Sequence, residues 1–129
     1  MVGCALPTES LPFFVIEGLY QGNFLDETVG TVPSLLSLGS QGGGTITGSW
    51  DEASDQNHTN TKMVSGTFDG TTFSGTLFVD WTSCPLLFTS TFTRTADTDG
   101  NTLSTLQGSY ATKSCTPAAS GSFNMHSSP

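Results

Sequence analysis

The feature that most constrains the fold is a Gly-x-aromatic triplet that recurs along the whole chain. It occurs six times, at residues 18–20, 22–24, 48–50, 66–68, 108–110 and 121–123. Residues two apart in a β-strand point to the same face, so each glycine shares one side of a sheet with its ring. Ala, Glu and Lys, which favour helices, total only 12 of the 129 residues. The repeat therefore predicts an all-β protein.

The alternation of each triplet continues into the residues around it. One face of these segments carries glycines and large apolar side chains, while the other is rich in Thr, Ser, Gln and Asn. This period of two is typical of strands with one buried and one wet face. The wet face accounts for a composition in which Thr, Ser and Gly make up 53 of the 129 residues.

Turn sequences such as Asp69-Gly70 divide the chain into eight expected strands. Segment 33–40 is also compatible with a helical turn. Eight antiparallel strands with short links predict an up-and-down β-barrel, because closure removes exposed edges. About ten rings point inward, so we expect an interior largely filled by aromatic side chains; the alternative is a ligand cavity between them. The expected strands are 14–25, 33–40, 45–51, 62–68, 71–81, 86–95, 102–112 and 118–126.

Repeats of the type Thr-Ile-Thr-Gly-Ser-Trp (45–50) and Val-Ser-Gly-Thr-Phe (64–68) resemble those of small bacterial lipocalin-like barrel proteins. The resemblance covers residues 14–126, which we expect to form the barrel domain, with residues 1–13 as a leader or tether. It implies an exported protein of the periplasm or cell envelope, held by a lipid anchor, or a secreted one. The Gly-x-Trp of lipocalins is replaced by Gly18-Leu19-Tyr20 in the first strand.

The three cysteines support the same compartment. Val2-Gly3-Cys4 matches the end of a bacterial lipoprotein signal, in which the cysteine carries the lipid; the alternative is an ordinary residue near a chain end. Cys84 and Cys115 both lie between small polar residues and a proline, in expected links between strands. We predict a disulfide between them, as in exported proteins, against the alternative of two reduced thiols in a cytosolic protein.

In an up-and-down barrel, links after odd strands meet at one end and links after even strands at the other. Both cysteines fall on odd links, so the topology allows the disulfide. The same end gathers acidic side chains that form a candidate binding site for a cation, a basic peptide or a basic protein surface. The alternative is a solvated rim that keeps the barrel soluble. The candidate residues are Asp26, Glu27, Asp51, Glu52, Asp55 and His58.

Several function classes are disfavoured. Three basic residues in a chain of formal charge −8 cannot neutralise many phosphates, so we expect no nucleic-acid partner. No apolar run is long enough to span a membrane. We find no catalytic motif and no metal-ligand spacing, and we expect no cofactor. His126, near the last residue, is expected to be frayed.

Three hypotheses follow from the sequence. The first is an exported, monomeric binding module, not an enzyme, that meets a protein, peptide or small molecule through its looped end. The second is a lipocalin-like carrier with a small apolar ligand between the rings. The third is an enzyme or a protease or lysozyme inhibitor; an inhibitor would project one ordered loop, expected at 52–61.

Overall fold

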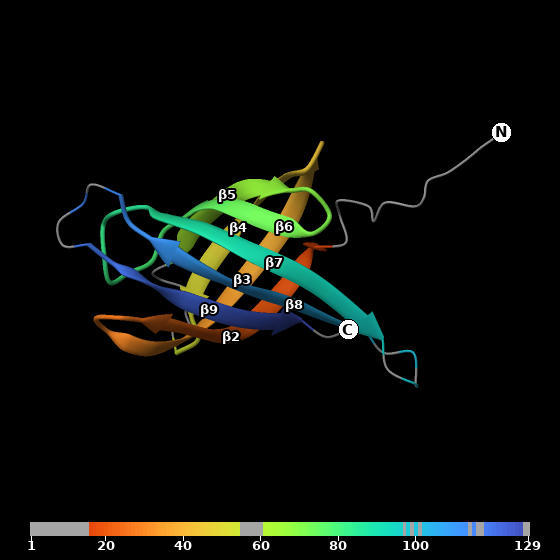
Figure 1. The fold of residues 1–129 in the computed structure, drawn as a ribbon, viewed down its shortest axis with the longest axis horizontal. Coiled ribbons are helices and arrows are strands. Elements are labelled where there is room, and N and C mark those ends of the chain that lie inside the picture. Colours follow the sequence, from red (N-terminus) through yellow and green to blue (C-terminus); the bar gives the residue numbers. More distant parts are fainter. Residues whose placement is uncertain are drawn as a thin grey trace.

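Eight strands close into one antiparallel barrel in this computed structural model (Figure 1). Each strand pairs with the next along the chain, and the last pairs with the first. The predicted up-and-down barrel is thus confirmed. The structure describes residues 16–54, 61–96, 98, 100, 102–113, 115 and 118–127. The strands are β2 (Gly18–Asp26), β3 (Gly30–Gly42), β4 (Thr45–Glu52), β5 (Lys62–Phe68), β6 (Thr72–Leu77), β7 (Leu86–Ala96), β8 (Thr102–Ala111) and β9 (Ser120–Ser127).

Several expected boundaries differ from the observed ones. Segment 33–40 is a strand, not a helical turn, and Pro33 lies inside β3 opposite Asn23 rather than at a strand start. Strand β6 ends at Leu77, so the last residues of the expected strand 71–81 belong to a loop. Strand β9 runs to Ser127, the last described residue, and His126 pairs there with Gln21; the expectation that His126 is frayed is wrong.

The interior is filled by rings, as predicted. Nine of the ten inward rings are buried and the tenth, Trp81, is half-buried. Phe24 lies at the centre of the cluster, stacked on Phe123 with 5.1 Å between ring centroids. It also meets Trp50, Trp81 and Tyr110 at 5.6–6.4 Å. Such edge and stacked contacts stabilise the core beyond the burial of apolar area.

The inward glycines let neighbouring strands approach each other. A Cβ on Gly48 would overlap the backbone carbonyl oxygen of Ser37, on the adjacent strand. The glycines 22, 66, 75 and 108 meet a neighbouring carbonyl in the same way. A glycine is required at these positions because the strand beside it occupies the space that a side chain would need. The Gly-x-aromatic triplet thus combines a close strand contact with a ring on the same face.

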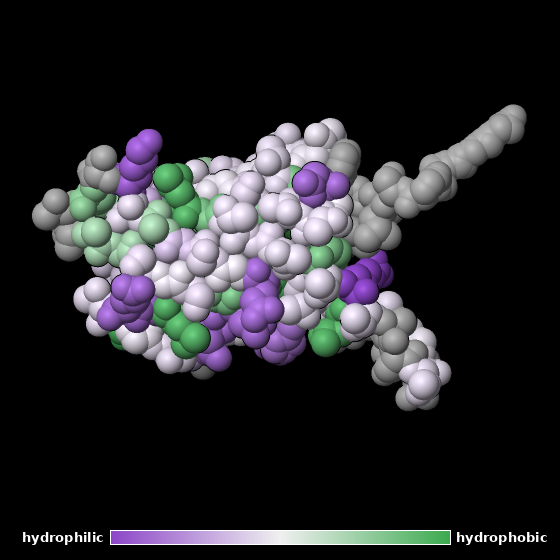
Figure 2. Space-filling view, in the orientation of Figure 1, coloured by the Kyte–Doolittle hydropathy of each residue, from purple (hydrophilic) through white to green (hydrophobic). Residues whose placement is uncertain are grey.

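The two ends of the barrel differ (Figure 1). At the looped end, on the left of the figure, β2, β4, β6 and β8 end, and the described links 27–29 and 78–85 lie there. At the tight-turn end β3, β5 and β7 end and β2 begins, and the described links 43–44 and 69–71 lie there. Between them, the face shown in Figure 2 is mostly pale, with apolar residues in separate small clusters. No described helix is long and apolar enough to cross a membrane.

Candidate functional site

A buried carboxylate organises the looped end. Asp26, the last residue of β2, is only 5% exposed, and four donors surround its two oxygens. Oδ1 accepts hydrogen bonds from the Tyr110 hydroxyl at 2.8 Å and the Trp81 indole N–H at 3.2 Å. Oδ2 accepts the backbone N–H groups of Thr28 at 2.9 Å and Val29 at 3.2 Å. The carboxylate therefore joins β2, β8 and the loop between β6 and β7.

These contacts shift two pKa values in opposite directions. Burial alone would raise the pKa of Asp26, but the hydrogen bonds from Tyr110, the two backbone N–H groups and Trp81 outweigh it and lower that pKa. Burial, together with the hydrogen bond to the Asp26 carboxylate, raises the pKa of the Tyr110 hydroxyl far above its usual range. At neutral pH the pair is a carboxylate and a phenol, the form in which the hydrogen bond is charge-assisted.

The loop at 78–85 is held at three points along its length. Val79 is buried in the core with 2% exposure, and the Trp81 indole donates to Asp26. Cys84 forms a disulfide with Cys115, with 6.4 Å between the two Cα atoms, which confirms the predicted pairing. Because the loop is fixed at these three points, its other side chains lie in defined positions, as they do in binding loops on rigid scaffolds.

A hollow at the looped end lies between this loop and β5. Its volume is about 460 Å³, and it opens widely to solvent. Apolar side chains form part of the wall, and one lysine and several hydroxyl groups complete it. The lining residues are Thr61, Lys62, Met63, Phe78, Val79, Thr82 and Ser83. A smaller hollow of about 70 Å³ lies on the other side of Thr82, next to Asp26 and Trp81.

The acidic residues predicted to form a binding rim lie at this end, but most of the described ones are engaged. Asp26 is enclosed as above. Asp51, 8% exposed, accepts the Thr61 hydroxyl at 2.6 Å, and Glu52 accepts that of Ser54 at 2.5 Å. Glu27 is exposed in the turn after β2. Asp55, His58 and Cys4 lie outside the described residues, and the rim stays a prediction.

Sequence reasoning placed Asp26 on the rim and missed its structural role. A carboxylate followed by Thr28 and Val29 at a strand end is typical of a turn in which the side chain accepts backbone N–H groups. That pattern could have predicted the two hydrogen bonds from the backbone N–H groups of Thr28 and Val29. The bonds to Trp81 and Tyr110 join residues 55 and 84 positions apart, and nothing in the local sequence indicates them.

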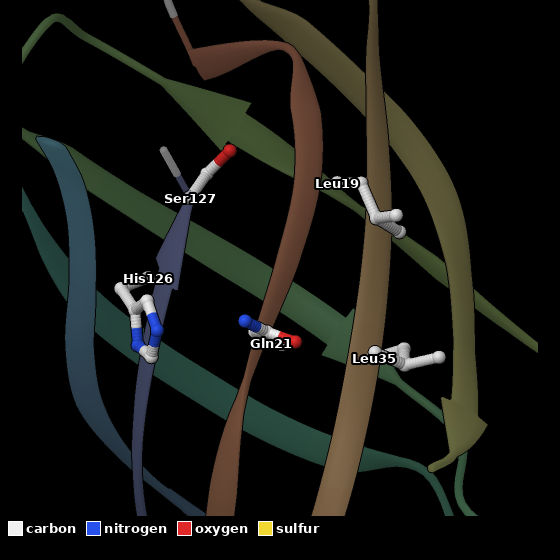
Figure 3. A pocket seen from close by; sticks show the side chains of 5 residues that line it. All are labelled: Leu19, Gln21, Leu35, His126 and Ser127. Carbon is white, nitrogen blue, oxygen red and sulfur yellow. The ribbon is translucent and has the colours of Figure 1, made fainter. Parts of the chain in front are cut away.

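A further hollow, of about 240 Å³, lies on the outer wall of the barrel (Figure 3). In Figure 3 the Gln21 side chain on β2 lies between His126 on β9 and Leu35 on β3. Leu19, 62% exposed, and Ser127 complete the lining. This groove lies away from the loops. Among the described residues, no group of three His, Cys, Asp or Glu side chains could hold a metal ion.

The sequence matches no protein-family model and no curated protein. Among solved structures, it is similar to rhizavidin, with a TM-score of 0.49 and 10% identity over 84% of this chain and 81% of that one. For the rhizavidin–biotin complex the TM-score is 0.49 and the identity 12%, over 84% of this chain and 92% of that one. For the complex of short afifavidin with biotin the TM-score is 0.47 and the identity 12%, over 82% of this chain and 86% of that one. These neighbours are avidin-like barrels. At this identity and TM-score the likeness says nothing about what the chain binds.

Proposed function

We propose that this protein is an exported binding module that takes up a small ligand at the looped end of its barrel. The observation that carries the proposal is the hollow of about 460 Å³ beside a loop fixed by the core, by Asp26 and by a disulfide. Fixing the wall before the ligand arrives lowers the entropy lost on binding. The disulfide is typical of exported proteins and supports that part of the proposal.

The site is proposed at the looped end rather than inside the barrel. A carrier of the lipocalin type needs an internal cavity, whereas here the rings of Phe24, Trp50, Phe123 and their neighbours are packed on one another. The proposal is for binding without catalysis. Asp26, the buried carboxylate at this end, has four donors and a lowered pKa, whereas a general acid needs a raised one.

A lipid on Cys4 is part of the same proposal. Strand β2 begins at the tight-turn end, so an anchor attached ahead of it would leave the looped end facing away from the membrane. The test is mass spectrometry of protein isolated from its own cells. A diacylglyceryl group on Cys4 is the expected result, and an unmodified cysteine would contradict anchoring but not ligand binding.

The binding proposal is tested with three probes that share a ten-carbon chain: decanoate, 1-decanol and decyltrimethylammonium. Amide NMR shifts are recorded during each titration. At least one probe is expected to shift the amides of Met63, Val79 and Thr82 with saturation at a single site. If none of the three moves these amides, the proposed function is contradicted.

Two variants make the location specific. Met63 and Leu19 are exposed to similar extents, 65% and 62%, but only Met63 lines the proposed hollow. Met63→Ala should weaken the bound probe severalfold, because part of the apolar wall is lost. Leu19→Ala serves as the matched control and should leave its affinity unchanged. Equal effects of the two substitutions would place the binding elsewhere.

A further inference from the structure

The hollow at the looped end contains one positive charge. Lys62 is the only ionisable side chain among the described residues that line it. It is half-buried at the start of β5, two positions from Val64, which is 1% exposed. A cation in this position attracts an anionic group.

The rest of the lining separates into an apolar part and a hydroxyl part. Met63, 65% exposed, and the half-buried Phe78 offer contact area for an apolar group. The Thr82 hydroxyl oxygen accepts the Cys84 N–H at 3.2 Å, which leaves its own hydrogen available to donate. Ser83 is exposed at the rim. None of the described lining residues carries a negative charge.

We propose that the ligand of this hollow is a small amphipathic anion whose charged group binds Lys62 and whose apolar body lies on Met63 and Phe78. This inference rests on the proposed function and names the class of ligand. A carboxylate at Lys62 accepts a charge-assisted hydrogen bond and can also accept from Thr82. A cationic ligand would meet Lys62 as a like charge, which disfavours it.

The inference is tested by isothermal titration with the three ten-carbon probes at neutral pH. Decanoate is expected to bind more tightly than 1-decanol, and decyltrimethylammonium to bind most weakly. Lys62→Gln should weaken decanoate by roughly tenfold, the size of one partly solvated charged hydrogen bond. The affinity of this variant for 1-decanol should stay within about twofold of the unsubstituted protein, because 1-decanol makes no ionic contact with Lys62.

Lys113→Gln is the matched control. It removes the same charge from the same end of the barrel, but Lys113 does not line the hollow. Its affinity for decanoate should stay within about twofold of the unsubstituted protein, since charges on the solvent-exposed surface are screened. Equal losses in the two variants would show that only net charge matters, and would overturn the role of Lys62.

The NMR signals of the Lys62 side chain give a second readout. Decanoate should move them as its carboxylate approaches the ammonium, and 1-decanol should move them less. Tight binding of 1-decanol at the hollow, unaffected by Lys62→Gln and equal to that of decanoate, would overturn the anionic ligand while leaving the proposed function intact. Failure of all three probes to shift the amides of the hollow would contradict both.

Discussion

The two ends of the barrel are closed by different kinds of contact. At the tight-turn end, Asp69 accepts the N–H groups of Thr71 at 2.9 Å and Thr72 at 2.7 Å, all within one turn. At the looped end, Asp26 accepts the same kind of backbone pair and in addition binds side chains 55 and 84 positions away. The Asp69 carboxylate stabilises a single turn, whereas the Asp26 carboxylate connects three parts of the chain.

The difference explains why the candidate site lies where it does. A tight turn satisfies its own backbone and leaves little surface that another molecule could enter. Long loops leave room for a hollow, but they remain ordered only if something holds them. Here the disulfide between Cys84 and Cys115 and the hydrogen bonds of Asp26 supply that order. Long-range contacts thus make the looped end suitable for binding.

The largest expected effect comes from breaking the looped-end carboxylate. Asp26→Ala leaves the hydroxyl of Tyr110, the indole of Trp81 and two backbone N–H groups without their acceptor. Because the Tyr110 hydroxyl and the Trp81 indole lie in or near the core, the free energy of unfolding should fall by about 3–5 kcal/mol. Urea denaturation followed by tryptophan fluorescence measures it. A loss below about 1 kcal/mol would contradict the proposal that the hydrogen bonds of Asp26 stabilise the looped end.

Removal of the disulfide should have the next largest effect. The double variant Cys84→Ser and Cys115→Ser opens a loop whose ends are 31 positions apart. On the chain-entropy account, a loop of that length stabilises the fold by about 3–4 kcal/mol. The unfolding free energy, measured against the unsubstituted protein under non-reducing conditions, should fall accordingly. Equal stability of the two proteins would show that the loop is held by its other contacts alone.

Acid should weaken the looped end through Asp26. Its pKa is lower in the folded protein than the ordinary value of 3.8, so its contribution to stability is present above that value. The contribution is lost as the pH falls through the lowered, folded-state pKa. Between pH 5 and pH 2, the unsubstituted protein should therefore lose more stability than Asp26→Ala. Parallel pH profiles, from thermal unfolding of both proteins, would contradict this assignment.

The smallest effect is expected at the tight-turn end. Asp69→Ala removes the acceptor of two N–H groups that are exposed enough for water to replace it. The melting temperature should fall by much less than for Asp26→Ala. The binding of the ten-carbon probes should not change. If the two aspartate variants were equally destabilised, the proposed contrast between the ends would be lost.

The sequence predicted those parts of the structure that depend on local pattern. The triplets gave the inner face, and Asp69-Gly70 gave a turn, because alternation and turn chemistry act between near neighbours. The end of β6 was misplaced because Val79 and Trp81 continue the apolar alternation after the strand has ended at Leu77. Burial continued there, but strand pairing did not.

The candidate site was less predictable. The topology brought Cys84 and Cys115 to the same end, which made their pairing predictable. The roles of Asp26 and Lys62 were not, because each depends on what the closed barrel places beside it. A lysine at a strand start is ordinary in a sequence. It becomes a candidate ligand contact because the loop at 78–85 forms a hollow beside it.

Native-state amide hydrogen exchange tests the central claim most directly, that the looped end is held as firmly as the barrel. The amides of Thr28 and Val29 donate to Asp26, and those of Thr71 and Thr72 donate to Asp69. The two pairs differ mainly in that Asp26 also binds distant side chains, those of Trp81 and Tyr110. The Asp26 pair should exchange only through opening that approaches global unfolding, and the Asp69 pair through local opening at much lower free energy. Fast exchange at Thr28 and Val29, equal to that of the turn, would contradict a preformed binding end.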